Sequence, residues 1–267
     1  MENQIGKFIG SGGTASVYEW ESDQIIKIFK PEVQIETIKH EEYIGKILND
    51  FSLNIPKYIK TIELGDKKGI IYERINGKQF AEIIFSATDQ SETAADFAKM
   101  HYEIHQNHTD KLPSQRDMFN WRIPKIENYL GKDLRKIQDL LDSLPTNNNL
   151  CHGDFHPLNI LVEHEKYIAI DWEGSCAGHP FLDVAWSYLT LISPLIQAMY
   201  GQLIGQTITD FSDEYLNFYC LYANTDKDLI LKYLPVVAVR RLCDNITCVG
   251  DASRYENDWL INIISSV

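Results

Sequence analysis

The sequence predicts an α+β protein with a small, strand-rich N-terminal lobe and a larger, mainly helical C-terminal lobe. The chain has 267 residues, a length that suits one large domain or two lobes. Residues 5–30 and 55–75 contain short runs rich in β-forming side chains. From residue 81 onward apolar residues recur mostly at helical spacing, apart from short strand-like runs at 159–162 and 167–171.

The N-terminal elements follow from local patterns. Isoleucines and a phenylalanine surround Lys27 in one predicted strand, and residues 69–73 form another. Residues 31–49 between them predict one helix, because Pro31 stands near its start and isoleucines recur at helical spacing. Asn-Gly at 76–77 is a turn signal, so we place the lobe boundary there, with lobes 1–76 and 77–267.

The charge balance excludes some partners. Lys and Arg total 25 against 38 Asp and Glu, a formal net charge of −13. Neutralising nucleic-acid phosphates, or binding an anionic membrane, needs clustered cations, so neither partner is expected. Residues 151–267 hold six basic and fifteen acidic side chains. This acidic half predicts a positively charged small-molecule partner, with a solvated outer surface as the alternative.

The cysteines and the apolar stretches predict a cytoplasmic protein. Five cysteines are present and none forms a C-x-x-C pair, so neither a disulfide framework nor a zinc site is expected. The N-terminus lacks the basic start and apolar core of a signal peptide. Residues 184–209 carry no charge, but they are too polar for a membrane span of about 20 apolar residues. We expect a pair of buried helices broken near Pro194.

A glycine-rich segment at residues 9–18 is the first sign of chemistry. Three glycines between β-type residues let a hairpin approach a ligand and expose backbone N–H groups to an anion. A tight turn alone is the alternative. No Gly-Lys-Ser or Gly-Lys-Thr follows, and the next element is a strand, so neither a Walker loop nor a dinucleotide fingerprint is indicated. The candidate phosphate-binding residues are Gly10, Ser11, Gly12, Gly13 and Thr14.

Lys27 lies inside a very apolar strand, so it must find an anionic partner or reach water. Glu41 is the better candidate partner, because it falls on the apolar stripe of the following helix, between Ile38 and Ile44. Glu42 has lysines nearby and is expected in solvent. An edge lysine with a surface glutamate remains the alternative.

The segments 151–162 and 168–173 contain an Asp, an Asn five positions later, and a second Asp at the end of an apolar strand. Asn159 and Asp171 offer the hard oxygen ligands that Mg²⁺ prefers. Asp154 can accept a proton from an attacking hydroxyl. Together with the glycine loop, Lys27 and the helix glutamate, this order predicts a metal–phosphate site.

In these motifs the chain resembles the aminoglycoside phosphotransferase family, which has the protein-kinase-like fold. Residues 152–159 resemble the family's H-G-D-x-H-P-x-N loop, and residues 170–173 its metal-binding I-D-[WF]-E segment. Residues 178–185 resemble its G-x-P-x-x-D-[LVI]-A segment. The resemblance runs from Gly10 to about Arg241 and implies an antiparallel sheet in the N-terminal lobe.

The resemblance implies roles for the candidate residues. Asp154 would be the catalytic base, Asn159 and Asp171 would bind Mg²⁺, and Lys27, oriented by Glu41, would contact the α/β-phosphates of ATP, although GTP is not excluded. Asp183 would hydrogen-bond the backbone of the catalytic loop. The backbone of the inter-lobe hinge, which bonds the adenine, would be supplied by Tyr72, Glu73, Arg74 and Ile75.

Two departures from protein kinases favour a small-molecule acceptor. Gly153 replaces the usual Arg before the catalytic Asp, and no long activation segment separates Asp171 from Asp183. We therefore expect a monomeric or weakly dimeric ATP-dependent phosphotransferase that modifies a hydroxyl of an aminoglycoside or another cationic metabolite. A kinase of thiamine, an amino alcohol or a sugar, a nucleotide-binding pseudoenzyme and a protein kinase stay open. His156 would either steady a phosphate oxygen or cap the loop.

Overall fold

The computed structural model of the protein describes residues 5–87, 89–131, 133–247 and 253–267. The chain divides into two compact units. The first unit comprises residues 1–80 and 158–173, and the second comprises residues 81–157 and 174–267. The sequence-based boundary at residue 76 differs from this division, because residues 158–173 pair with the N-terminal region, and pairing between distant segments leaves no turn signal.

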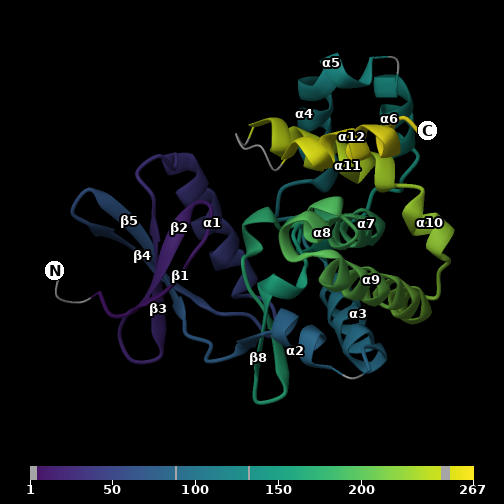
Figure 1. The fold of residues 1–267 in the computed structure, drawn as a ribbon. Coiled ribbons are helices and arrows are strands. Elements are labelled where there is room, and N and C mark those ends of the chain that lie inside the picture. Colours follow the sequence, from purple (N-terminus) through teal and green to yellow (C-terminus); the bar gives the residue numbers. More distant parts are fainter. Residues whose placement is uncertain (1–4, 88, 132, 248–252) are drawn as a thin grey trace. The chain divides into compact units, whose positions relative to one another are not determined.

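The first unit is built on an antiparallel sheet of five strands in the order β1-β2-β3-β5-β4, with helix α1 beside it (Figure 1). One face of the sheet packs against α1 through a cluster that joins Phe29 and Ile70 to Ile38. The other face carries a second cluster, formed by Ile26, Ile28 and Ile71. The elements are β1 (Phe8–Ser11), β2 (Ala15–Glu19), β3 (Gln24–Phe29), α1 (Ile35–Leu48), β4 (Tyr58–Leu64) and β5 (Lys67–Glu73).

Helix α1 begins later than the sequence pattern predicts. Pro31 does not start it, because Gln34 is still extended, with φ −66° and ψ 145°, and serves as the N-cap. The apolar stripe is as expected: Ile38, Glu41, Ile44 and Leu48 are all buried. The helix therefore presents Glu41 to the sheet.

A three-stranded sheet completes the first unit. Its order is β6-β8-β9, with β6 (Lys78–Gln79), β8 (Ile160–Glu163) and β9 (Lys166–Ala169). The β8–β9 hairpin is thereby joined to the strand that follows the large sheet. The expected strand-like runs at 159–162 and 167–171 correspond to this hairpin.

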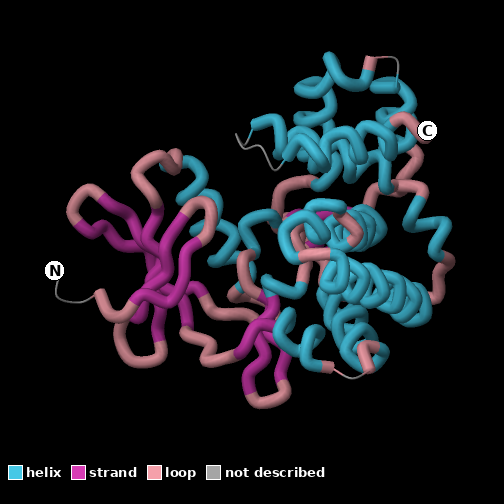
Figure 2. Tube along the Cα trace, viewed as in Figure 1, coloured by secondary structure: helices cyan, strands magenta, loops and turns pink. Residues whose placement is uncertain are grey.

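The second unit is mostly helical, as the colouring of Figure 2 shows. Helices α3 and α9 pack side by side, as do α11 and α12. Strands β7 (Asn149–Cys151) and β10 (Cys176–Gly178) pair as a short two-stranded sheet. Strand β7 comes directly before residues 152–159, which resemble the family's H-G-D-x-H-P-x-N loop. The helices are α2 (Phe80–Ser86), α3 (Ser91–His105), α4 (Gln115–Arg122), α5 (Glu127–Leu130), α6 (Asp133–Asp142), α7 (Pro180–Leu191), α8 (Pro194–Tyr200), α9 (Gln202–Ala223), α10 (Lys227–Leu231), α11 (Leu234–Thr247) and α12 (Ser253–Ile264).

The apolar stretch after residue 180 forms separate helices, with the break just before Pro194 as expected. The expectation of two buried helices is wrong for α8, which has no buried residue, while α7 is mostly buried. The hydroxyl of Ser193 caps α8 by accepting the N–H of Leu195 at 3.2 Å. Among the described residues, the helical stretch Pro180–Tyr200 is long and apolar enough to span a membrane by length and composition alone, with a mean hydropathy of 1.2. Half of it is buried inside the protein. Core packing of α7 is sufficient to account for that apolar character.

Candidate active site

Lys27 and Glu41 meet in the first unit. Lys27 projects from β3, and its Nζ lies 2.9 Å from the Glu41 carboxylate of α1. The hydroxyl of Tyr72, on β5, donates to Glu41 Oε1 at 3.1 Å. Burial alone would lower the pKa of Lys27, but Glu41 and Asp171 outweigh it and hold the pKa above its usual value. The lysine is therefore a fixed cation.

Asp171 extends this cluster toward solvent. Its Oδ1 lies 3.5 Å from Lys27 Nζ, and half of its side chain, 50%, is exposed. Its φ of 61° is uncommon for a residue other than glycine, and such backbone strain gathers at functional sites. The peptide of Ile170, just before it, donates to the Asn159 carbonyl at 2.9 Å, which ties the two segments together.

The donor set of this hairpin fits a hard divalent cation. Asn159 and Asp171 supply an amide oxygen and a carboxylate, the ligand types that Mg²⁺ takes in proteins. Both residues belong to the first unit, like Lys27. Because Asp171 Oδ1 lies 3.5 Å from Lys27 Nζ, a metal bound to Asp171 would lie close to the lysine.

The glycine loop faces open space. A Cβ added at Gly10, Gly12 or Gly13 would meet no atom within 4 Å, and none of the three has left-handed backbone geometry. The turn itself therefore does not require glycine at these positions. The loop is held by its own contacts: the Gly12 N–H donates to the Ala15 carbonyl at 2.9 Å, and Lys30 Nζ donates to the Gly13 carbonyl at 2.8 Å. Because the Gly12 N–H is used within the loop, it does not face an anion as the glycine pattern predicted.

The segment that resembles the hinge, residues 72–75, begins in the last two residues of β5. The N–H of Glu73 donates to the Lys57 carbonyl at 3.0 Å, and the N–H of Arg74 donates to the Asp23 carbonyl at 2.9 Å. Both amides are thus used inside the first unit. Nucleobase binding by this segment would rest on its carbonyls and on the amide of Ile75, which is half-buried.

Asp154 lies in the second unit, in the segment 152–157 that we call the HGD loop. Its Oδ1 accepts the indole N–H of Trp186 at 3.1 Å, and its Oδ2 lies 3.4 Å from His156 Nε2. Burial would raise the pKa of Asp154, but His156, Arg240 and the Trp186 hydrogen bond outweigh burial and lower it. The group is a carboxylate at neutral pH. His156 contacts this carboxylate, while His152 is buried and its Nδ1 accepts the Asp154 N–H at 3.2 Å.

Two features fix the backbone of the HGD loop. Gly153 has a φ of 80°, and a Cβ there would lie 2.0 Å from the Gly174 carbonyl oxygen, so glycine is required. Asp183, in the first turn of α7, accepts the N–H of His152 at 2.7 Å and the N–H of Gly153 at 2.9 Å. The role that the resemblance implies for Asp183 has this geometry.

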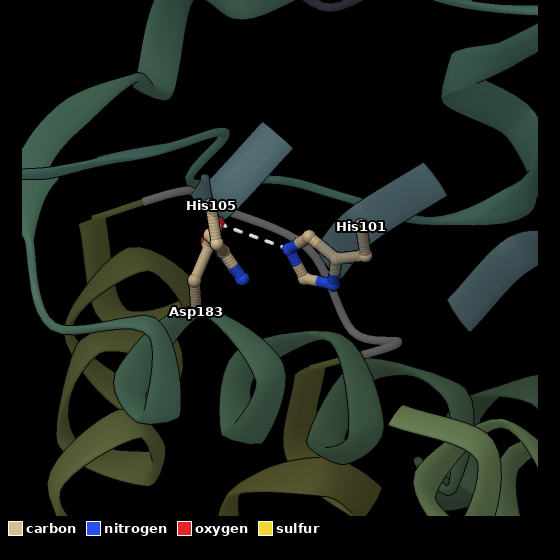
Figure 3. A group of neighbouring side chains, drawn as sticks. All are labelled: His101, His105 and Asp183. Atoms are coloured by element: carbon tan, nitrogen blue, oxygen red, sulfur yellow. Dashed lines mark hydrogen bonds and ion pairs between the residues drawn. The ribbon is translucent and has the colours of Figure 1, made fainter. Parts of the chain in front are cut away.

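The Asp183 carboxylate also accepts from two buried histidines of α3 (Figure 3). Nε2 of His101 and Nε2 of His105 each lie 3.1 Å from Asp183 Oδ2. Their Nδ1 atoms lie 2.8 Å and 2.7 Å from the hydroxyls of Tyr215 and Tyr219, on α9. Because Asp183 can only accept, each Nε2 carries the proton. His101 is neutral because burial lowers its pKa, so the Tyr215 hydroxyl donates to its Nδ1. Although these side chains are of metal-binding types, hydrogen bonding accounts for the whole cluster.

Sequence reasoning missed the residues that surround Asp154 and Asp183. The two histidines stand one turn apart in α3 and the two tyrosines one turn apart in α9, a periodicity that marks facing stripes. No such local signal points to Trp186 or Arg240. Among the aromatic side chains of residues 119–129, Phe119 is buried in the core, while Trp121 and Tyr129 are 61% and 50% exposed. A small cavity between α4, α7 and α11 is lined by Gln115, Met118, Phe119, Arg122, Gly153, Cys176, Leu182, Asp183 and Arg240.

The antiparallel sheet with its one helix, followed by a helical unit, defines a protein-kinase-like fold. Solved structures with this fold match nearly the whole chain. The chain belongs to the phosphotransferase enzyme family, whose sequence model matches residues 5–215. The resemblance deduced from the motifs, and the fold class it implied, are therefore confirmed.

The similar solved structures share the fold at low sequence identity. The ADP-bound aminoglycoside phosphotransferase APH(2'')-Ib is 17% identical with a TM-score of 0.63, covering 99% of this chain and 93% of its own. The amicoumacin kinase hAmiN, in complex with AMP-PNP, Ca²⁺ and Ami, is 14% identical with a TM-score of 0.64, covering 100% and 89%. A choline/ethanolamine kinase family protein from Mesorhizobium loti is 13% identical with a TM-score of 0.63, covering 98% and 87%.

The curated relatives are much longer proteins. Acyl-CoA dehydrogenase family member 11 from Homo sapiens is 22% identical over 266 residues, covering 85% of this chain and 34% of the relative. Acyl-CoA dehydrogenase family member 10 from Mus musculus is 35% identical over 96 residues, covering 33% of this chain and 9% of the relative. At its longest match the chain thus spans about a third of such a relative.

Proposed function

We propose that the protein transfers the γ-phosphoryl group of ATP to a hydroxyl of a small molecule. The observation that carries this proposal is the Lys27–Glu41–Asp171 cluster beside an open glycine loop. A half-buried lysine, held as a cation and placed next to an exposed carboxylate, suits a phosphate chain with its metal. Family membership and the nucleotide complexes among the similar structures support the same class.

Each candidate residue has a distinct task in this proposal. Lys27 offsets phosphate charge, and Glu41 and Tyr72 hold the lysine in place. Asn159 and Asp171 would hold Mg²⁺, which when bound supplies charge neutralisation of the phosphates. Asp154 accepts the hydroxyl proton. Because its pKa is lowered, it aligns the hydroxyl and takes up the proton late in the transfer.

For the acceptor we propose only a class of molecule, a small molecule with a hydroxyl group. The acidity of the C-terminal half led us to expect a cationic acceptor, with an aminoglycoside as the first test. Two of its acidic groups, Asp183 and Glu256, are buried and hydrogen-bonded. The cavity beside Gly153 is lined by Arg122 and Arg240. Neutral and anionic alcohols therefore belong in the same panel as the amines.

The test is coupled ADP release across aminoglycosides, amino alcohols, thiamine, sugars and hydroxy acids, with Mg-ATP or Mg-GTP. We expect acceptor-dependent release with at least one class, and a phosphorylated product by mass spectrometry. Nucleotide binding without any transfer would instead indicate the pseudoenzyme alternative, and transfer only to a peptide array would indicate a protein kinase. The expected cytoplasmic location, the reduced state of the cysteines and the monomeric or weakly dimeric state stay predictions.

A further inference from the structure

We propose that Trp186 and Arg240 form a clamp that orients the Asp154 side chain for transfer. The inference rests on the proposed function, since it assigns positioning residues to the same reaction. Both residues lie in the second unit with Asp154, so the geometry that carries the proposal is internal to one unit.

The first half of the clamp is a direct hydrogen bond. The indole Nε1–H of Trp186 donates to Asp154 Oδ1 at 3.1 Å, and only 4% of Trp186 is exposed. A buried, rigid ring has few other orientations, so its N–H defines one position for that oxygen. Rotating the Asp154 carboxylate away would break a hydrogen bond to a charged group in a partly buried place, which is the costly kind.

The second half holds the ring itself. The guanidinium of Arg240, from α11, lies over the Trp186 ring with Cζ 3.7 Å from the ring centre. Its Nη1 donates to the Gly153 carbonyl at 2.6 Å. Arg240 therefore fixes both the indole and the peptide directly before Asp154. A planar guanidinium can stack and donate at once, whereas a lysine ammonium cannot.

Helix α7 places Trp186 relative to the HGD loop. Asp183 and Trp186 stand three positions apart on α7, so they share one face of the helix. Asp183 holds the HGD loop by its backbone amides, and Trp186 holds it by the Asp154 side chain. One rigid helix face thus sets both the loop and its carboxylate.

The kinetic test compares Trp186→Phe with a matched control on the same helix. Phenylalanine keeps an aromatic ring under Arg240 but removes the donor. We expect kcat to fall roughly 10- to 100-fold, as for loss of a hydrogen bond to a charged group, with KM for Mg-ATP little changed. Tyr188→Phe removes the hydroxyl that donates to Asp213 at 2.9 Å and should leave both constants unchanged. An unaltered kcat in Trp186→Phe would overturn the clamp.

Arg240 is tested by a graded pair. Arg240→Lys keeps the charge but not the planar stack, and Arg240→Met loses both. We expect kcat to decrease in the order wild type, lysine variant, methionine variant. Wild-type kcat in both variants would remove Arg240 from the clamp.

A readout without turnover separates this inference from the proposed function. The indole N–H resonance of Trp186, identified by its loss in Trp186→Phe, should shift in the proton spectrum of Asp154→Ala, because its acceptor is gone. An unmoved resonance contradicts the clamp, even if phosphotransfer is found. A shifted resonance in a protein that phosphorylates no acceptor supports the clamp and refutes the reaction.

Discussion

At the scale of single residues, the cation Lys27 and the carboxylate Asp154 both keep their charge although each is partly buried. Burial disfavours the charged form of each, yet each stays charged because partners of opposite sign or suitable hydrogen-bond donors surround it. For Lys27 the partners are Glu41 and Asp171, and for Asp154 they are His156, Arg240 and Trp186. Both groups are therefore fixed in charge and position before a substrate arrives.

Replacing Asp154 by alanine tests its assignment as the base. We expect turnover to fall by roughly 10²–10⁴, because the group that takes the hydroxyl proton is gone. Affinity for the nucleotide should change little, since Lys27, Glu41 and Asp171 lie in the first unit. Steady-state kinetics and calorimetry of Mg-ATP binding measure the two quantities. A clean Asp154→Ala preparation that keeps most of its activity would exclude this role.

At the scale of elements, two short segments carry the candidate metal ligands and the loop anchor. Asn159 directly precedes the β8–β9 hairpin and Asp171 follows it, while α7 presents Asp183 to the HGD loop. The motif spacing predicted Asn159 and Asp171 as candidate ligands, whereas the role of Asp183 was implied only by the family resemblance. It could not predict His101 and His105, because their partners on α7 and α9 come from far along the chain and each histidine alone looks like an ordinary core residue.

The hairpin makes an ordered prediction about the metal. Asp171→Ala should weaken Mg²⁺-dependent nucleotide binding more than Asn159→Ala, because a carboxylate brings a full negative charge and an amide does not. Calorimetric titration of each variant with ATP, with and without Mg²⁺, gives the comparison. The assignment of these ligands is wrong if Mg-ATP binds both variants as it binds the wild type.

The α3–α7–α9 cluster makes a prediction about stability and pH. Burial, and then the nearby His105, lower the pKa of His101 from 6.5 to about 3. Between these values the unfolded chain binds a proton that the folded protein does not, so stability rises with pH there and falls as the pH drops below about 6.5. The slope from this one group approaches about 1.4 kcal/mol per pH unit. The pKa of Asp183 is held below its usual value, so protonation of Asp183 further lowers the stability of the folded protein below about pH 4.

Urea unfolding between pH 7 and 4 measures this loss, and His101→Gln provides the comparison. Glutamine keeps an amide N–H for Asp183 but cannot be protonated. The variant should be less stable at pH 7, yet lose less stability on acidification than the wild type. Parallel pH profiles of the two proteins would show that His101 does not titrate as the structure indicates.

At the scale of the whole molecule, the fold class and the Lys27–Glu41 pair were predictable from sequence, because strand composition and helical spacing are local signals. The pairing of residues 158–173 with the N-terminal region was not, nor was the arrangement of charge around Asp154. A count of acidic residues along the chain does not tell which of them are buried in the folded protein. Asp183 and Glu256 count toward the net charge of −13, yet they face buried hydrogen-bond donors.

The salt dependence of catalysis tests whether that net charge matters for the acceptor. If the acceptor is cationic, the field of the whole protein speeds its encounter, and ions at 0.15 M limit exposed interactions to roughly 8 Å. We therefore expect kcat/KM to fall as salt rises, with kcat changing less, because screening acts on encounter and not on bound groups. The measurement is a series of initial rates at increasing NaCl for the best acceptor of each charge class. A neutral or anionic alcohol turned over well, while no amine in the panel reacts, would refute the cationic acceptor and leave the acidity as solvated surface.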